Sequence, residues 1–266
     1  MSDTAKRIRV PDLKEKKKRG EKIAVLTAYD ATMARLMDRA GIDVLLVGDS
    51  LGMVILGYET TLPVTLDAMV HHTRAVSRGA SRALVVADMP FLTFQVDVSE
   101  AVRNAGRLIQ EGGAAAVKLE GGRPVLDVTR RLVDIGIPVM GHLGLVPQSV
   151  HQLGGFRPQA RRERDAERLI EDARELERAG AFAVVLESIP AEVSKAVTAE
   201  LSIPTIGIGA GPHCDGQVLV SYDVLGISDE FVPPFARQYA KLGELLVEAA
   251  KAYAEDVRAG RFPAEK

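Results

Sequence analysis

The strongest constraint on the fold is a short apolar segment that ends abruptly in glycine and polar residues. Residues 44–47 read VLLV without a polar break, and residues 48–52 continue as GDSLG. An unbroken run of aliphatic and β-branched residues is typical of a strand covered on both faces, as in a parallel sheet. The residues after it must belong to the loop that leaves the strand. Asp49 is therefore expected where a buried strand opens into a turn.

The same pattern recurs along the chain and alternates with predicted helices. Buried strands are predicted at 23–28, 43–47, 83–88, 114–120, 137–142, 181–187 and 204–209, with an eighth at 218–220 or 224–225. Such alternation predicts an α/β fold with a parallel sheet, either an open doubly wound sheet or a closed (β/α)8 barrel. Eight units in about 250 residues favour the barrel. An open sheet would usually carry a glycine-rich phosphate motif after its first strand, where this chain reads Thr-Ala-Tyr-Asp.

The composition favours one domain. The chain has 266 residues, of which 47% are hydrophobic and 26% charged, and no linker or compositional shift interrupts it. We therefore predict a single (β/α)8 barrel domain over 1–266, with 1–21 as a polar N-terminal extension and 236–266 as a C-terminal helix and tail. The helix is expected at 236–258. The basic run at 16–19 is interpreted as a solvated helix face or tail rather than a functional patch.

Several classes of protein are disfavoured by charge and composition. The formal net charge is −2 and there is no tryptophan, so neither a nucleic-acid surface nor an anionic membrane is an expected partner. No apolar run approaches the roughly 20 residues of a membrane span, and the first residues lack the apolar core of a secretory signal. Cys214 is the only cysteine, so an internal disulfide is impossible. We expect a cytoplasmic protein.

Five predicted strands deliver an ionisable residue at or just after their carboxyl ends. These residues are Asp49, Asp88, Glu120, His142 and Glu187. In a (β/α)8 barrel the active site lies at this end of the strands. Several acidic groups in one pocket repel one another and need a cation or a shared proton. The set therefore predicts a functional site.

Each residue also has a structural interpretation when it is taken alone. Asp49 or Asp88 could cap the helix that follows it. His142 could be a core histidine whose nitrogens are hydrogen-bonded. Glu187 could stabilise the start of the next helix.

Lys118 strengthens the functional interpretation. It lies two residues before Glu120, so both side chains point to the same face of a strand. A lysine inside an apolar strand is costly unless it is paired. It could form a structural pair with Glu120, or it could direct its charge at a carboxylate or enolate oxygen of a substrate.

The residue types favour a hard divalent ion. Carboxylates without a cysteine cluster suit Mg²⁺, which takes few protein ligands and keeps water or substrate oxygens. A 2-oxo acid could supply two such oxygens, and the ion would then stabilise its enolate. A carboxylate or histidine from another strand could remove the proton next to the ketone.

Two glycine-containing loops are weaker signals. Residues 207–211, GIGAG, could offer backbone N–H groups to an anion, and a tight turn explains them equally well. Residues 144–155, which include Pro147, Gln148 and His151, could be a lid, a wall of a second substrate site, or a plain connection.

The chain resembles the ketopantoate hydroxymethyltransferase family from about Leu13 to Pro263. Its motifs read LTAYD at 26–30, LVGDSLG at 46–52, DMPF at 88–91, VKLEG at 117–121, GHLGLVPQ at 141–148 and IGIGAG at 206–211. Phe94 stands where the family commonly has tyrosine, and Pro234 where it commonly has lysine.

The resemblance implies a barrel of the phosphoenolpyruvate/pyruvate type with a Mg²⁺ site. Asp49 and Asp88 would hold the ion, and Glu120 would bind it directly or through water. Asp49, Ser50, Asp88 and Lys118 would contact the oxo acid.

The resemblance also implies a reaction. Glu187 would accept the proton, and we add His142 to the residues expected to bind substrate. A hydroxymethyl group would pass from 5,10-methylenetetrahydrofolate to 3-methyl-2-oxobutanoate through a Mg²⁺-stabilised enolate, giving 2-dehydropantoate in pantothenate biosynthesis. Its partners would be these small molecules and copies of itself, in a homo-oligomer that is typically a decamer.

Two other hypotheses remain open. A lyase or mutase on the same barrel would act on an oxaloacetate- or isocitrate-like acid, but it would usually carry a reactive cysteine in a mobile loop, whereas Cys214 stands near glycines. A catalytically inactive barrel could serve as an assembly scaffold, although all the carboxylates are present.

Overall fold

The computed structural model describes residues 6–228 and 232–264. The chain divides into two compact units, Met1–Val218 and Leu219–Lys266. The first contains the elements that position the candidate site. The assignment of the whole chain to one domain stays a prediction.

A closed barrel of parallel strands forms the centre of the first unit, and consecutive strands are neighbours all the way round. The strands are β1 (Ile23–Thr27), β2 (Val44–Val47), β3 (Leu84–Asp88), β4 (Ala116–Glu120), β5 (Val139–Gly144), β6 (Ala183–Glu187), β7 (Thr205–Ile208) and β8 (Gly216–Leu219). The barrel confirms the predicted fold class and excludes the open sheet.

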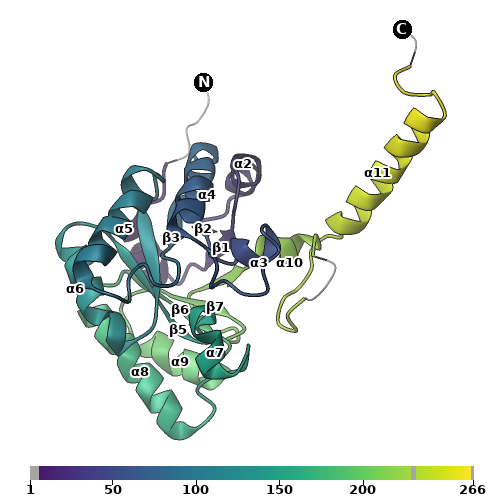
Figure 1. Ribbon diagram of the computed structural model, residues 1–266. Coiled ribbons are helices and arrows are strands. Elements are labelled where there is room, and N and C mark those ends of the chain that lie inside the picture. Colours follow the sequence, from purple (N-terminus) through teal and green to yellow (C-terminus); the bar gives the residue numbers. More distant parts are fainter. Residues whose placement is uncertain (1–5, 229–231, 265–266) are drawn as a thin grey trace. The chain divides into compact units, whose positions relative to one another are not determined.

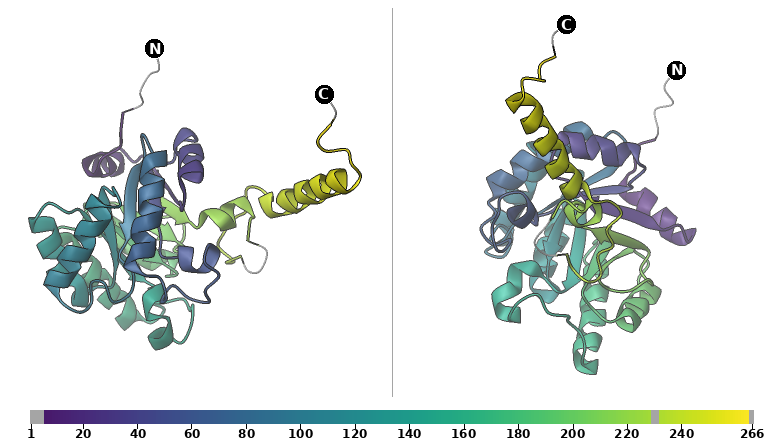
Figure 2. Two further views of the ribbon diagram at one scale, coloured as in Figure 1. Left: turned by 45° about the horizontal axis from the view of Figure 1, so that its top comes forward. Right: turned by 90° about the vertical axis from the view of Figure 1, so that its right-hand side faces the viewer.

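Helices surround the barrel and cover the outer faces of its strands (Figure 1 and Figure 2). In the first unit they are α1 (Val10–Lys18), α2 (Ala31–Arg39), α3 (Leu51–Val54), α4 (Leu66–Gly79), α5 (Val98–Gln110), η1 (Arg123–Val125), α6 (Leu126–Asp134), η2 (Pro147–Ser149), α7 (Val150–Leu153), α8 (Glu163–Arg178) and α9 (Ala191–Glu200). Because helices cover one face and the interior covers the other, the strands read as continuous apolar runs.

The barrel interior is filled by alternate residues of each strand. The cluster includes Val44 and Leu46 of β2 and Leu84 and Val86 of β3, as expected for side chains that alternate between the two faces of a strand. Leu13 of α1 is fully buried in the same cluster. The predicted polar extension therefore contains a helix that contributes to the core.

The basic run at 16–19 is not simply a solvated face. Lys17 donates hydrogen bonds to the carbonyl oxygens of Thr198 and Ile203, at 2.9 and 3.0 Å. Its ammonium also lies 2.9 Å from a carboxylate oxygen of Asp215. The solvated interpretation is therefore wrong for Lys17, which ties α1 to the segments around β7.

Several predicted boundaries are also corrected. The last strand is β8 at Gly216–Leu219, and Val224 lies instead in α10 (Ser221–Leu225). The terminal helix α11 spans Leu242–Arg258 and so begins later than predicted. The loop at 144–155 contains the short helices η2 and α7, and the short helix α3 follows β2.

The second unit contains α10 and α11. Helix α11 has no buried residue along its length. Among residues 6–228 and 232–264, no helix has both the length and the apolar character that crossing a membrane requires.

Candidate active site

Four strands carry their ionisable residues in the same alternation as the core. Counting in steps of two from inward-facing Val86, Ala116, Met140 and Val185 leads to inward positions at the carboxyl ends of β3, β4, β5 and β6. These positions are occupied by Asp88, Lys118 and Glu120, His142 and Glu187. The interior is therefore apolar at one end and densely ionisable at the other.

Lys118 is the central cation of this cluster. Its ammonium lies 3.3 Å from Asp88 Oδ1, 4.0 Å from Glu120 Oε1 and 3.0 Å from His142 Nδ1. Only 4% of its side chain is exposed. Burial alone would lower the pKa of Lys118, but the carboxylates of Asp88 and Glu120 outweigh burial and raise it. Lys118 is therefore charged at neutral pH.

Asp49 follows β2 and lies beside Asp88. The backbone N–H of Asp49 donates to Asp88 Oδ2 at 3.1 Å. Burial, together with the charge of Asp88, raises the pKa of the Asp49 carboxyl to about 7. Burial and the charge of Asp49 likewise raise the pKa of Glu120 well above its ordinary value.

Gln148, in the loop after β5, joins several of these groups. Its backbone N–H donates to Glu120 Oε2 at 2.9 Å, and its side-chain amide donates to Asp49 Oδ2 at 2.9 Å. From the sequence, Gln148 was expected only as a member of the loop at 144–155, which could be a lid, a wall of a second substrate site or a plain connection. The available signal was a glutamine next to Pro147 in a loop that leaves a strand end.

His142 stands between Lys118 and Glu187. Burial and the charge of Lys118 lower the pKa of His142 well below its ordinary value, so the ring is neutral. An ammonium can only donate hydrogen bonds, so Nδ1 must accept from Lys118 and Nε2 must carry the ring proton.

His142 Nε2 lies 3.1 Å from Glu187 Oε2 but is not aligned for a hydrogen bond. Burial raises the pKa of Glu187 to about 7, against the opposing charge of Lys118. The carboxyl group of Glu187 can therefore take up or release a proton near neutral pH, and the ring of His142 beside it is neutral.

Ser50 lies next to Asp49 and is half-buried. Its hydroxyl is 2.9 Å from the hydroxyl of Tyr29, which follows β1 and is buried. Tyr29 itself was not expected from the sequence to have a role in the site. The pair brings a hydroxyl group from the β2 loop to the neighbourhood of the carboxylates.

The structural alternatives fare differently. Asp49 does not cap the following helix, because α3 begins after Ser50 and has no side-chain cap. Asp88 accepts from Asp49, which precedes it in the chain, so it does not act as a helix cap through that bond. The pairing of Lys118 with Glu120 is loose at 4.0 Å, and Asp88 is the closer partner.

The donor set fits a divalent cation that protein ligands hold only in part. Asp88 Oδ1 is buried and accepts no hydrogen bond, although it lies 3.3 Å from the ammonium of Lys118. The raised pKa values of Asp49 and Glu120 show crowded carboxylates that a cation would relieve. Within 6–228 and 232–264, no three His, Cys, Asp or Glu side chains are already grouped to hold a metal ion. The arrangement suits Mg²⁺ completed by water and substrate rather than a closed cage.

The glycine-rich loop after β7 is explained by its backbone. Gly209 and Gly211 have φ angles of +60° and +79°, and a Cβ on Gly211 would lie 2.5 Å from Ala191 Cβ. The anion-binding interpretation stays a prediction. Cys214, in the same connection, is buried.

Two comparisons with known proteins, one with a family profile and one with individual relatives, indicate the same family. The sequence profile described as ketopantoate hydroxymethyltransferase matches residues 7–265. A relative named 3-methyl-2-oxobutanoate hydroxymethyltransferase, from Moorella thermoacetica, is 58% identical over 257 residues, covering 97% of this chain and 96% of the relative.

Solved structures with the same fold are more distant in sequence. One is 2,3-dimethylmalate lyase, a PEP mutase/isocitrate lyase superfamily member, with a TM-score of 0.61, 18% identity and coverage of 97% of this chain and 88% of that one. Another is phosphonopyruvate hydrolase with oxalate and Mg²⁺, with a TM-score of 0.62, 12% identity and coverage of 95% and 88%. At these identities the likeness establishes the fold alone, which is the closed barrel of parallel strands described above.

Proposed function

Because the chain belongs to the ketopantoate hydroxymethyltransferase family, we propose that it transfers a hydroxymethyl group from 5,10-methylenetetrahydrofolate to 3-methyl-2-oxobutanoate, giving 2-dehydropantoate for pantothenate biosynthesis. The observation that carries the proposal is the gathering of Lys118, Glu187 and three carboxylates in one barrel interior. It supplies a fixed cation, a proton acceptor and a cation site within one cluster.

The oxo acid is held mainly by Lys118. Its buried ammonium is positioned by Asp88, at a distance of 3.3 Å. Because this end of the barrel is shielded from water, that positive charge stabilises a carboxylate or developing enolate oxygen more than it would in bulk water. Ser50 adds a hydroxyl donor from the β2 loop. His142, whose Nδ1 accepts from Lys118, restricts where that ammonium points.

Asp49 and Asp88 would hold a Mg²⁺ ion, with Glu120 acting directly or through water. The bound ion would supply positive charge beside the oxygens of the oxo acid and so favour loss of the neighbouring proton. Asp88 Oδ1, which is ion-paired with Lys118 but accepts no hydrogen bond, and the crowded carboxylates support this assignment.

Glu187 is the proposed proton acceptor. Its carboxylate takes the proton from C3, and the electron pair left on C3 forms the bond to the methylene carbon of the folate as the bond from that carbon to one folate nitrogen breaks. The proton held by Glu187 goes to that nitrogen. Water then displaces the second folate nitrogen from the methylene carbon, leaving the hydroxyl on it and a proton on the nitrogen, and tetrahydrofolate leaves. A pKa of about 7 suits a group that must take up and release a proton at neutral pH.

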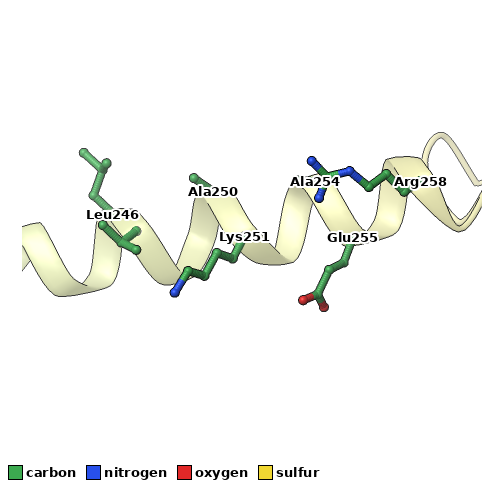
Figure 3. A pocket seen from close by; sticks show the side chains of 7 residues that line it. Leu246, Ala250, Lys251, Ala254, Glu255 and Arg258 are labelled. Atoms are coloured by element: carbon green, nitrogen blue, oxygen red, sulfur yellow. The ribbon is translucent and has the colours of Figure 1, made fainter.

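We place the enzyme in the cytoplasm as a homo-oligomer, following the family pattern of a decamer. The support here is α11, whose Leu245, Leu246 and Tyr253 are 57%, 65% and 58% exposed. Figure 3 shows Leu246, Ala250 and Ala254 along one side of this helix. Large apolar side chains in water are typical of a surface that a partner covers.

Exchange of the C3 proton tests the chemistry without the folate. The enzyme is mixed with Mg²⁺ and 3-methyl-2-oxobutanoate in D2O, and loss of the C3 proton signal is followed by NMR. Exchange should require Mg²⁺, and Glu187→Gln should slow it at least about 10²-fold, the usual contribution of a positioned base.

The matched control is Glu192→Gln on α9, whose side chain is 82% exposed. It should exchange at the unmodified rate. Native exchange by Glu187→Gln would remove Glu187 from the mechanism. Failure of the unmodified enzyme to form product with the folate would contradict the proposed reaction itself.

A further inference from the structure

Gln148 makes four hydrogen bonds that tie the loop after β5 to three other strand ends. Its backbone N–H donates to Glu120 Oε2 at 2.9 Å, at the end of β4. Its side-chain amide donates to Asp49 Oδ2, after β2, and to the carbonyl oxygen of Met89, after β3, both at 2.9 Å. The side-chain oxygen Oε1 of Gln148 accepts a hydrogen bond from the side-chain amide of Gln95 at 3.0 Å.

These partners determine the orientation of the amide. The carbonyl oxygen of Met89 can only accept, so the NH2 group of Gln148 must face it. The second hydrogen of the same NH2 group then points at Asp49. Because Gln148 is 5% exposed, water does not compete effectively for these bonds.

These contacts occupy one oxygen in each of two carboxylates, those of Asp49 and Glu120, and leave the other oxygen without a bond to Gln148. Gln148 engages Oδ2 of Asp49 and Oε2 of Glu120. The remaining Oε1 of Glu120 faces Lys118 at 4.0 Å and His142 at 3.6 Å. Gln148 thereby restrains the side-chain torsions of two acids, Glu120 at the end of β4 and Asp49 just after β2.

We propose that Gln148 is a positioning residue that holds Asp49 and Glu120 in the orientation needed for cation binding and fastens the loop after β5 over the mouth. This inference rests on the proposed function, since it concerns the same cation site. It assigns a purpose to the long loop at 144–155 that the reaction chemistry leaves unexplained. Hydrogen bonds to carboxylate ligands commonly change metal affinity about 10- to 100-fold when they are removed.

Calorimetric titration with Mg²⁺ alone, and with Mg²⁺ plus 3-methyl-2-oxobutanoate, tests the proposal in the full-length protein. Gln148→Met retains the length of the side chain and removes its hydrogen bonds to Asp49, Met89 and Gln95. We expect the Kd for Mg²⁺ to rise about tenfold or more. Saturating Mg²⁺ should restore most of kcat, which a merely misfolded loop would not allow.

Two further variants sharpen the result. Gln152→Ala alters an exposed glutamine of the same loop and should leave the Kd unchanged. Gln95→Ala, at an exposed residue, removes the bond to Gln148 Oε1 and a long local bond from the Phe94 N–H at 3.4 Å, leaves the bonds of Gln148 to Asp49 and Met89, and should raise the Kd by a smaller factor. It keeps the test valid if Gln148→Met does not fold.

The outcomes separate this inference from the proposed function. Unmodified protein that binds Mg²⁺ and the oxo acid but forms no product contradicts the reaction and leaves Gln148 as assigned. A folded Gln148→Met protein with an unchanged Kd for Mg²⁺, alongside an active unmodified enzyme, overturns the positioning role alone. If only Gln95→Ala folds, an unchanged Kd in that variant overturns it as well.

Discussion

At the scale of single residues, the same burial has opposite consequences for different groups. Burial raises the pKa of Glu187 to about 7, because a carboxylate loses its hydration. Burial and the nearby Lys118 charge lower the pKa of His142, because a second cation is unfavourable there. Glu187 can therefore accept a proton near neutral pH while the adjacent ring of His142 stays neutral, because burial disfavours the charged form of both side chains.

The pH dependence of C3 proton exchange should follow Glu187. Below its raised pKa of about 7 the carboxyl is protonated and cannot accept a proton, so the rate should fall about tenfold per unit below roughly pH 6. Above the pKa the carboxylate form predominates and the rate should level off. Exchange measured by NMR at saturating Mg²⁺ gives the profile, and a flat profile across about pH 5 to about pH 8 would contradict the assignment.

At the scale of elements, the junction of β5 and β6 is unusually tight. Strand β5 continues to Gly144, which pairs with Glu187 at the end of β6. Gly144 has a φ of +95°, and a Cβ there would meet the carbonyl oxygen of Glu187. The proposed base is therefore positioned by a strand pairing that only glycine permits.

Gly144→Ala should destabilise the protein more than Gly154→Ala does. Both positions have positive φ, at +95° and +69°, and each substitution incurs about 1 kcal/mol of backbone strain, but nothing lies within 4 Å of a Cβ at Gly154. The added clash at Gly144 should bring its total to about 2 kcal/mol or more. Denaturant unfolding of both variants measures the difference, and equal losses would mean that the clash relaxes without cost.

At the scale of the whole molecule, the chain presents a barrel unit that contains the candidate site and a C-terminal unit that ends in α11. Helix α11 begins at Leu242 and buries none of its residues within the chain. A helix in a protein gains most of its stability from packing an apolar face against its neighbours. A second protein surface, in our proposal another copy of the chain, would supply that packing.

Replacing Leu246 by glutamate should therefore weaken self-association without unfolding the barrel. The side chain is 65% exposed within the chain, so the charge costs little until a partner covers it. Light scattering coupled to gel filtration should show a smaller average mass for Leu246→Glu than for the unmodified protein. Leu36→Glu, at a 52% exposed residue of α2, is the control and should keep the unmodified mass. A monomeric unmodified protein would contradict the homo-oligomer.

The sequence alone determined the barrel and the strands that carry ionisable residues. Apolar runs report burial on both faces, and the period of two places Lys118 and Glu120 on the same side once the strand is known. The pattern was weakest at β8 and α11, where the predicted bounds were wrong. There the apolar residues are few or do not pack within the chain, so periodicity reports little.

Only the tertiary structure decided which groups touch. Gln148 donates to Asp49 across 99 positions of sequence, and Lys17 reaches the carbonyl oxygen of Ile203 across 186. A hydrogen bond depends on the position of two atoms to a few tenths of an ångström. Closure of the barrel sets those positions, whereas composition and periodicity record only which faces are shielded from water.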